Sequence, residues 1–537
     1  MACKINIIEA IIFLLLLLQT ANSIRLATNS RWIVNEATGK RVKLACANWV
    51  SHLQPMIAEG LEKQPLKYIA GQIAETGFNC VRFTWPTFMF TRPEYGNLTV
   101  SQSLDKFGLR DAKAGIARNN NQFLYMSVME VHKAVVNELG RNNLMVVLDN
   151  HISEPKWCCS GRDGNGFFGD ASFDPNEWLK GLAAVAATYK DNPAVVAMSM
   201  RNELRGDREN EPDWYKYMQL GALTINKQNP HVLVIVSGLH YDGHLEFLKS
   251  KPFVVNIGNK LVFEAHWYTF GTPAEKWKAQ TNLVCASMTQ SVENNFLFLI
   301  RGNHPSYPLF LSEYGIDQTG VNEADNRYIS CFLAAVVEND LDWALWAFQG
   351  SYMLREGGVN VGESYGIMDF NWVRPKNPSF VQRLQFARQM NQGSISRQLT
   401  SYYKIFHPET GLCVQLGRNN LIFLSGCTNA THWDQHRHGG TIRPAGSRAC
   451  LVVAGNNFAA EVRDDCTSNR SKWIIVSTSR LHLAARNGQG SYFCLHKNAA
   501  DGTILTAKCL CVGNNLIDLH TCADNPQSQW FKFVPVN

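Results

Sequence analysis

The sequence predicts a (β/α)₈ barrel, or TIM barrel, followed by a smaller all-β trefoil domain. Between residues 40 and 350, eight short apolar runs alternate with helix-like stretches. Beyond residue 400, a unit bracketed by cysteines and ending near a tryptophan occurs three times. Eight strand–helix units are typical of a closed parallel barrel, and three repeats of about 40 residues are typical of a trefoil.

Residues 1–23 have the three-part organisation of a secretory signal peptide. Lys4 supplies a positive charge, an apolar run extends from Ile11 to Leu18, and Ala21 and Ser23 are small residues suited to cleavage. A membrane anchor is the alternative, but about 20 apolar residues are needed to span a bilayer. We therefore expect a secreted, extracellular protein without a transmembrane segment.

Composition narrows the function classes. The chain has 537 residues, 45% of them hydrophobic and 18% charged, which is typical of a globular protein of several domains. A net charge of +6 is small for this length and gives no support for a nucleic-acid partner. The 14 tryptophans suit a protein that stacks on sugar rings, although core packing uses the same residues.

The 15 cysteines also point to an oxidising compartment. Cys3 belongs to the predicted signal peptide, which leaves 14 of the 15, an even number suited to disulfides. No Cys-x-x-Cys pair is present, so we expect no metal site. Asn97, Asn429 and Asn469 lie in Asn-x-Ser/Thr sequons, which predicts a glycoprotein if these residues are exposed.

The eight apolar runs suit strands that are buried on both faces, as in a parallel sheet. They are Val42–Asn48, Asn79–Trp85, Leu144–His151, Val195–Glu203, Val232–Gly238, Leu261–Tyr268, Leu309–Gly315 and Trp343–Gly350. A doubly wound open sheet is the structural alternative. The preceding segment, Arg25–Lys40, reads as a hairpin that could close the floor of the barrel.

Polar or aromatic residues stand at the ends of most of these runs. They are Arg82, His151, Asn202, Glu203, His266, Tyr268, Glu313 and Trp346. A structural contact would explain any one of them, but packing does not explain polar groups at the end of strand after strand, because burying them is costly. The C-terminal ends of barrel strands build the active site, so we predict that this set forms it.

Two carboxyls stand out in this set. Glu203 ends the fourth run and Glu313 lies near the end of the seventh, so they can face each other across a bound sugar. Retaining glycoside hydrolysis needs such a pair about 5–5.5 Å apart, with one carboxyl protonated and the other ionised. Arg82 could keep Glu313 ionised, and Tyr268 could donate a hydrogen bond to the same carboxylate.

The other residues of the set suit substrate binding. Asn202 could hold the sugar 2-OH, His151 and His266 could supply further hydrogen bonds, and Trp346 could form a stacking floor. Asp149 and Glu264 each stand two residues before a histidine, and we expect them to point into the barrel as salt-bridged support. A Ser-His-Asp hydrolase is disfavoured because no Gly-x-Ser-x-Gly follows a strand.

Six motifs, each closing a predicted strand, resemble glycoside hydrolase family 5, the cellulase family, over residues 24–395. They are Val81-Arg82-Phe83, Leu148-Asp149-Asn150-His151, Arg201-Asn202-Glu203, His266-Trp267-Tyr268, Ser312-Glu313-Tyr314-Gly315 and the strand ending at Trp346. The resemblance implies Glu203 as acid/base, Glu313 as nucleophile, retention of configuration, and neither a metal nor an organic cofactor. It also implies a plant-type secreted enzyme of the cell wall or apoplast, acting as a monomer on β-linked cell-wall glycans or glycosides.

The loop after the third strand carries aromatic residues and adjacent cysteines. Trp157, Phe167 and Phe168 could line a sugar subsite or simply pin the loop by packing. Cys158 and Cys159 are expected to pair elsewhere, because a ring between adjacent cysteines is strained. Further candidates for sugar stacking, weighed against ordinary packing, are Trp49, Trp267 and Trp372.

The C-terminal repeat follows a predicted linker at residues 393–400. Its copies contain Thr431-x-Trp433, Ser471-x-Trp473 and Ser528-x-Trp530, and the expected disulfides are Cys413–Cys427 and Cys450–Cys466. The pairing of the remaining cysteines in this region stays open: Cys494, Cys509, Cys511 and Cys522. Residues 401–537 resemble a ricin B-type lectin, but Thr or Ser replaces the Gln of its Gln-x-Trp signature. Binding of a second glycan and a purely structural role are therefore the two alternatives.

Three functions fit these observations. The first is hydrolysis of a β-linked glycan, the second is transglycosylation by the same residues, and the third is sugar binding by an inactive barrel. The intact set of Glu203, Glu313, Arg82 and Tyr268 argues against the third, because a binding protein has no chemical need for it.

Overall fold

The computed structural model of the chain describes residues 24–301, 305–393, 402–435 and 439–536. The signal peptide predicted at residues 1–23 lies outside the described residues, as does the linker predicted at 393–400 apart from Gly393. No helix within the described ranges is long and apolar enough to cross a membrane.

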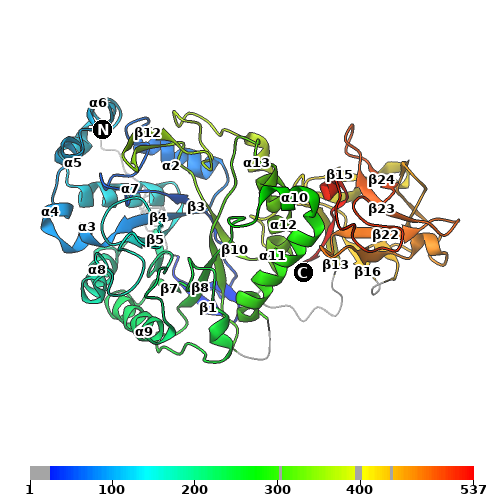
Figure 1. Cartoon of the computed structure of the whole chain (residues 1–537), viewed down its shortest axis with the longest axis horizontal. Coiled ribbons are helices and arrows are strands. Elements are labelled where there is room, and N and C mark those ends of the chain that lie inside the picture. The colour runs from blue at the N-terminus through cyan, green and yellow to red at the C-terminus, as the bar shows by residue number, and fades with distance from the viewer. Residues whose placement is uncertain (1–23, 302–304, 394–401, 436–438, 537) are drawn as a thin grey trace, which may run out of the picture.

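Eight parallel strands close into a barrel, with the last strand pairing with the first (Figure 1). They are β3 (Ala45–Trp49), β4 (Cys80–Pro86), β5 (Met145–Ile152), β6 (Val195–Ser199), β7 (Leu233–Val236), β8 (Leu261–His266), β9 (Leu309–Tyr314) and β10 (Asp342–Leu345). Each predicted run overlaps one of these strands, so the barrel prediction is confirmed and the open-sheet alternative is wrong.

Helices surround the barrel between successive strands. The longer ones are α2 (Leu66–Glu75), α6 (Arg110–Asn119), α7 (Val128–Arg141), α8 (Pro175–Thr188), α9 (Glu211–Gln228), α11 (Thr281–Asn295) and α12 (Glu323–Asn339). The shorter ones are α3 (Thr87–Thr91), α4 (Pro93–Gly96), α5 (Val100–Lys106), α10 (Ala274–Ala279) and α13 (Pro378–Arg383). Ser127 caps α7 through a capping box with Glu130, which shows how local sequence starts these helices.

A hairpin of β1 (Leu26–Asn29) and β2 (Trp32–Asn35) covers the end of the barrel at which the strands begin. Leu26 and Ile33 are buried against residues inside the barrel, and Thr28 N donates to Asn259 O at 2.8 Å just before β8. The predicted hairpin and its place at the floor are therefore confirmed.

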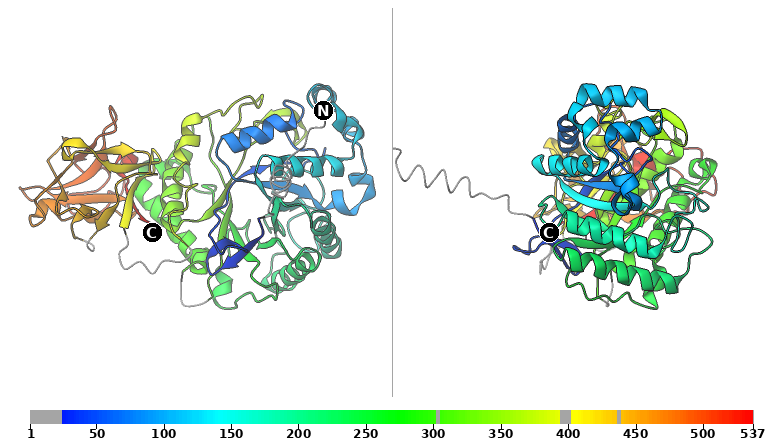
Figure 2. Two further views of the ribbon diagram at one scale, coloured as in Figure 1. Left: turned by 180° about the vertical axis from the view of Figure 1, so that it is seen from behind. Right: turned by 90° about the vertical axis from the view of Figure 1, so that its left-hand side faces the viewer.

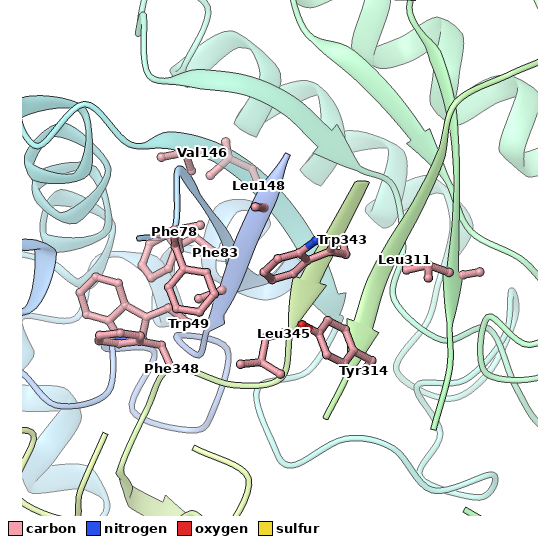
Figure 3. Close-up of a cluster of buried hydrophobic side chains, with 14 of the residues drawn as sticks. Trp49, Phe78, Phe83, Val146, Leu148, Leu311, Tyr314, Trp343, Leu345 and Phe348 are labelled. Atoms are coloured by element: carbon pink, nitrogen blue, oxygen red, sulfur yellow. The ribbon is translucent and has the colours of Figure 1, made fainter. Parts of the chain in front are cut away.

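The layer between strands and helices is rich in aromatic side chains (Figure 3). Tyr314 on β9 and Phe78 before β4 both contact Trp343, with ring centroids 5.7 and 6.1 Å apart. Trp49, Trp267 and Trp372 are also buried in this core. Their prediction as sugar-stacking residues is wrong, because Trp49 on β3 and Trp267 and Trp372 in loops all have their rings buried away from solvent.

The C-terminal region is all-β with antiparallel pairing, as predicted. Its strands are β13 (Tyr402–His407), β14 (Leu412–Leu416), β15 (Ile422–Ser425), β16 (Trp433–Gln435), β17 (Ile442–Pro444), β18 (Cys450–Val452), β19 (Phe458–Ala459), β20 (Glu461–Arg463), β21 (Ile474–Val476), β22 (His482–Arg486), β23 (Tyr492–Lys497), β24 (Ile504–Ala507) and β25 (Lys532–Val536). The disulfides Cys413–Cys427 and Cys450–Cys466 are confirmed, and the open set resolves as Cys494–Cys509 and Cys511–Cys522.

The repeated tryptophans follow two patterns. Trp433 and Trp473 are buried in the core of the β region, and their indole nitrogens donate to Val414 O at 3.2 Å and Leu451 O at 2.8 Å. Trp530 instead donates to Asn282 Oδ1 of α11 at 3.1 Å. The third repeat therefore anchors the β region to the barrel.

Helices α10, α11 and α12 lie between the barrel and the β region (Figures 1 and 2). Cys522 N donates to Ala279 O at 2.9 Å, and Lys532 forms an ion pair with Glu338 at 2.8 Å. Buried apolar residues of both regions form one continuous cluster.

Candidate active site

A cavity of about 650 Å³ opens at the C-terminal ends of the barrel strands. Seven of the eight residues predicted for the site line this cavity: His151, Asn202, Glu203, His266, Tyr268, Glu313 and Trp346. They come from five of the barrel strands or the turns that follow them. The position of the cavity follows from topology, because all strands of a parallel barrel end on the same face.

Glu203 lies in the turn after β6 and adopts a positive φ of 46°, which is uncommon for a residue with a side chain. Its backbone N donates to Asp242 Oδ2 at 2.8 Å, which holds the turn. Its carboxyl lies 2.9 Å from His266 Nδ1. Burial raises the pKa of Glu203 to about 7, and Arg205 and Arg82 only partly oppose that effect.

Glu313 lies on β9 and has stronger hydrogen-bond donors. Arg82 NH1 donates to Glu313 Oε1 at 2.7 Å, and Tyr268 Oη donates to Oε2 at 3.1 Å. Burial raises the pKa of Glu313 to about 7, against the opposing charges of His266 and Arg82. Both donors stabilise the ionised form, so the geometry favours a carboxylate at Glu313.

The two carboxyls face each other across the cavity. A carboxyl oxygen of Glu203, one of Glu313 and a ring nitrogen of His266 all lie within 4.8 Å of one another. Retaining glycosidases hold their two carboxyls about 5–5.5 Å apart, whereas inverting enzymes leave about 6.5–9.5 Å for a water. The observed spacing belongs to the shorter class.

Arg82, the eighth residue of the predicted set, does not line the cavity. Its side chain is fully buried behind the carboxyls, where NH2 lies 3.0 Å from Asp149 Oδ1 and 3.7 Å from Glu264 Oε2. NH2 also donates to Asn202 Oδ1 at 2.8 Å. A buried guanidinium needs several acceptors, and these groups supply them. The prediction that Asp149 and Glu264 serve as salt-bridged support is confirmed.

His151 is fixed from two sides. Its Nδ1 lies 2.6 Å from Asp149 Oδ2, which leaves Nε2 to face the cavity. Its ring stacks on Trp346 with centroids 5.5 Å apart and on His52 at 4.0 Å. Burial lowers the pKa of His151 well below its usual value, so this ring is a neutral hydrogen-bonding group.

The aromatic residues of the loop after β5 take both of the predicted roles: one lines the cavity, and two hold the loop by packing. Trp157 lines the cavity and stacks under Arg355, whose guanidinium lies 3.7 Å from the ring centroid. Phe167 and Phe168 are buried, and Phe168 packs on Trp178 at 5.2 Å. Only Trp157 is therefore available to a ligand.

Cys158 and Cys159 form a disulfide with each other, so the expectation that each pairs elsewhere is wrong. The other barrel cysteines pair as Cys46–Cys80 and Cys285–Cys331, which leaves no unpaired cysteine in the part of the barrel that the structure describes. Both sulfurs lie at the cavity wall, where Asn202 Nδ2 donates to them at 3.8 and 3.5 Å.

The predicted set omitted two supporting residues. Asn48 accepts from Arg82 NH1 at 3.0 Å and donates to Ser312 O at 3.0 Å, and it closes the first predicted run, so the strand-end signal could have found it. Asp242 supports Glu203 from a loop after β7. No strand-end pattern marks it, because its role depends on a contact between two loops.

Two side-chain groups in the described part of the chain have the geometry to hold a cation. One is Glu203, His266 and Glu313, and the other is His151, Cys158 and Cys159. Sulfurs joined in a disulfide are poor ligands, because metals bind the thiolate. The carboxyl pair is the more suitable of the two for a hard cation.

This fold and site define a glycosidase that hydrolyses O-glycosyl bonds. The chain belongs to glycosyl hydrolase family 5, the cellulase family, whose model matches residues 36–351. It is 41% identical over 539 residues to a "Glycosyl hydrolase 5 family protein" of Chamaecyparis obtusa, covering 98% of this chain and 96% of that one. It is 19% identical over 376 residues to an endoglucanase of Paenibacillus polymyxa, covering 65% and 84%.

Solved structures support the fold. The endocellulase of the archaeon Pyrococcus horikoshii superposes with a TM-score of 0.54 at 18% identity, covering 68% of this chain and all of that one. The catalytic domain of the major endoglucanase of Xanthomonas campestris superposes with a TM-score of 0.52 at 20% identity, covering 68% and 99%.

Proposed function

We propose that this protein is a retaining hydrolase of β-linked glucans or glucosides, with Glu313 as nucleophile and Glu203 as acid/base. The short spacing of the two carboxyls carries the proposal, and the arginine behind Glu313 assigns the roles. Two relatives named endoglucanases favour a β-glucan substrate.

The reaction would proceed in two displacements. Glu313 attacks the anomeric carbon while Glu203 gives its proton to the departing glycosidic oxygen, which forms a glycosyl-enzyme ester. Glu203, now ionised, takes a proton from water as the water attacks the same carbon and releases Glu313. The sugar keeps its anomeric configuration because it is inverted twice.

The cavity residues would position the reacting sugar. The Asn202 amide is oriented by Arg82 at its oxygen, so its nitrogen can face a sugar hydroxyl. His151 presents its free ring nitrogen, and Trp346 offers a ring face to the sugar. We assign these residues to substrate binding, with no cofactor in the reaction.

The remaining proposals concern the setting of the enzyme. We infer a secreted, plant-type protein, since seven disulfides suit an oxidising compartment. We divide it into a catalytic domain at residues 24–395 and a ricin B-type lectin-like domain at 401–537, with a second glycan as the ligand of the latter. The three sequon asparagines are exposed, which suits glycosylation.

The decisive experiment compares wild type with Glu313→Ala on β-glucan, mannan, xylan and aryl β-glucosides. We expect sugar release by wild type alone. Azide should partly restore turnover of the aryl glucoside by Glu313→Ala, giving a glycosyl azide of inverted configuration. Full activity of Glu313→Ala without azide would overturn the assignment of the nucleophile.

A further inference from the structure

Two exposed aromatic side chains line the rim of the cavity beyond the residues that surround the carboxyl pair. Tyr241 lies in the loop after β7 and Phe270 in the loop after β8, and these strands are neighbours in the barrel. Their exposed fractions are 41% and 69%. Large apolar rings left open at the mouth of a cavity indicate a surface that a ligand covers.

The loop with Tyr241 is attached to the turn that carries Glu203. Tyr241 N donates to Leu204 O at 2.9 Å, and the neighbouring Asp242 accepts from Glu203 N at 2.8 Å. His240, Tyr241 and Asp242 all have positive φ, which gives the loop a defined shape. Because Glu203 is the proposed acid that protonates the departing oxygen, Tyr241 lies on the leaving-group side.

The ring of Phe270 is positioned by stacking on a neighbouring aromatic side chain. One face of its ring stacks on Tyr268, with centroids 4.6 Å apart and planes inclined by 13°, while most of the ring is open to solvent. Tyr268 is itself held by Glu313, so the position of Phe270 is fixed relative to the reacting atoms. The Tyr365 ring is also near, with its centroid 6.3 Å from that of Phe270 and the two planes inclined by 51°.

We propose that Tyr241 and Phe270 form a subsite for a leaving group with a flat apolar face, either a second pyranose ring or an aromatic aglycone. The proposal rests on the proposed function, because it uses Glu203 as the acid. Aromatic rings bind the C–H face of a pyranose and the face of an aryl group by the same contact. A sugar bound there after the first displacement could also replace water as acceptor, which would give transglycosylation.

The test compares substrates that share the glucosyl glycone and differ in the leaving group: β-D-glucosyl fluoride, 4-nitrophenyl β-D-glucoside and cellobiose. Fluoride is too small to reach the rim. In Tyr241→Ala and Phe270→Ala, we expect kcat/KM to fall about tenfold for one or both large leaving groups and to change less than about twofold for the fluoride. Phe458→Ala is the matched control, because Phe458 is 65% exposed on β19 of the C-terminal region.

The substrate that loses activity identifies the ligand. Loss with cellobiose alone means a sugar subsite, loss with the nitrophenyl glucoside alone means an aryl subsite, and loss with both means a subsite that accepts either group. Unchanged variants beside an active wild type would overturn the subsite and leave the proposed function intact. An equal loss with the fluoride would also overturn it, since the residues would then act on folding or on the carboxyl pair. A wild type inactive on all three substrates would overturn the proposed function.

Discussion

The chemistry of this site depends on the protonation states of two buried carboxyls, those of Glu203 and Glu313. Burial raises the pKa of both Glu203 and Glu313 to about 7. At a separation within 4.8 Å, the negative charge of one opposes ionisation of the other. Of these two carboxyls, Arg82 contacts only that of Glu313, so the single proton of the pair belongs on Glu203. This protonation state is the one that double displacement needs.

The pH dependence of kcat/KM should therefore be bell-shaped around neutral pH. Activity falls at low pH as Glu313 gains a proton and at high pH as Glu203 loses its proton. In Glu203→Gln with 2,4-dinitrophenyl β-D-glucoside, whose leaving group needs no acid, the alkaline limb should disappear. The acidic limb should stay near its wild-type position, because Glu203 is already protonated and uncharged at the pH where Glu313 ionises. An alkaline limb that persists in this variant would contradict the account.

The Cys158–Cys159 disulfide should affect catalysis more than stability. It joins adjacent residues, so it closes almost no loop of the unfolded chain. In the double variant Cys158→Ala/Cys159→Ala, Asn202 Nδ2 loses the sulfurs that it contacts, and we expect KM to rise several-fold with the midpoint of urea unfolding nearly unchanged.

The matched control is the double variant Cys285→Ala/Cys331→Ala, which removes a disulfide that joins α11 and α12 across 46 residues. Its loss should cost about 2–5 kcal/mol of unfolding free energy and leave KM unaltered. The reverse pattern in the two variants would contradict the role given to the adjacent pair.

Among the secondary-structure elements, helix α12 shows how the end opposite the active site is held. The helix ends at Asn339, and Asp340 follows in the left-handed conformation with its side chain buried. It pairs with Arg41 and with Lys43, the latter at 2.8 Å, so it connects α12 to the segment that leads into β3. Burial alone would raise the pKa of Asp340, but Lys43 and Arg41 together lower it to about 2.

Asp340→Asn should lower the free energy of unfolding at pH 7 by about 3–5 kcal/mol, because it leaves two buried cations without their partner. In wild type, this contribution is present above the unfolded pKa of about 3.9 and is lost as the pH falls toward 2. Urea unfolding at several pH values measures both effects. Asp105→Asn, which breaks the exposed pair with Lys113, should cost less than about 1 kcal/mol.

For the whole molecule, the arrangement of the two regions argues against a loosely tethered accessory domain. Helix α12 is buried along nearly its whole length, since it packs on the barrel and also against β25 of the β region. A helix that is buried on nearly all sides needs neighbours on all sides. Lys532 pairs with Glu338 of α12, and Trp530 donates to Asn282 of the neighbouring α11.

The two regions should therefore unfold together. Calorimetry of the full chain should give one thermal transition, and a chain ending at residue 393 should aggregate or melt at least about 5 °C lower, because it exposes α12. Trp530→Ala should destabilise the whole protein while preserving the β-region core around Trp433 and Trp473. Two independent transitions, with an unchanged barrel in the shortened chain, would contradict the single unit.

The local pattern of the sequence determined the barrel, the repeat and most of the site. Continuous apolar runs indicate strands that are buried on both faces. The C-terminal ends of the parallel strands all lie on the same face of the barrel. Glu203, Glu313, His151 and Tyr268 could therefore be assigned to one cavity before any contact was known. The two disulfides of the first two repeats could also be predicted from the sequence, because each pair of cysteines lies within one repeat.

Only the tertiary structure decided which side chains meet across long sequence separations. It placed Arg82 behind the carboxyls, buried Trp49 and Trp372, and paired Cys158 with its neighbour Cys159. It also turned Trp530 from the core of its own repeat to the barrel, and brought the Tyr241 loop onto Glu203. The physical reason is the same in each case. The burial of a side chain and its bonding partners depend on how segments distant in the sequence pack together, and local residue type and spacing do not show that packing.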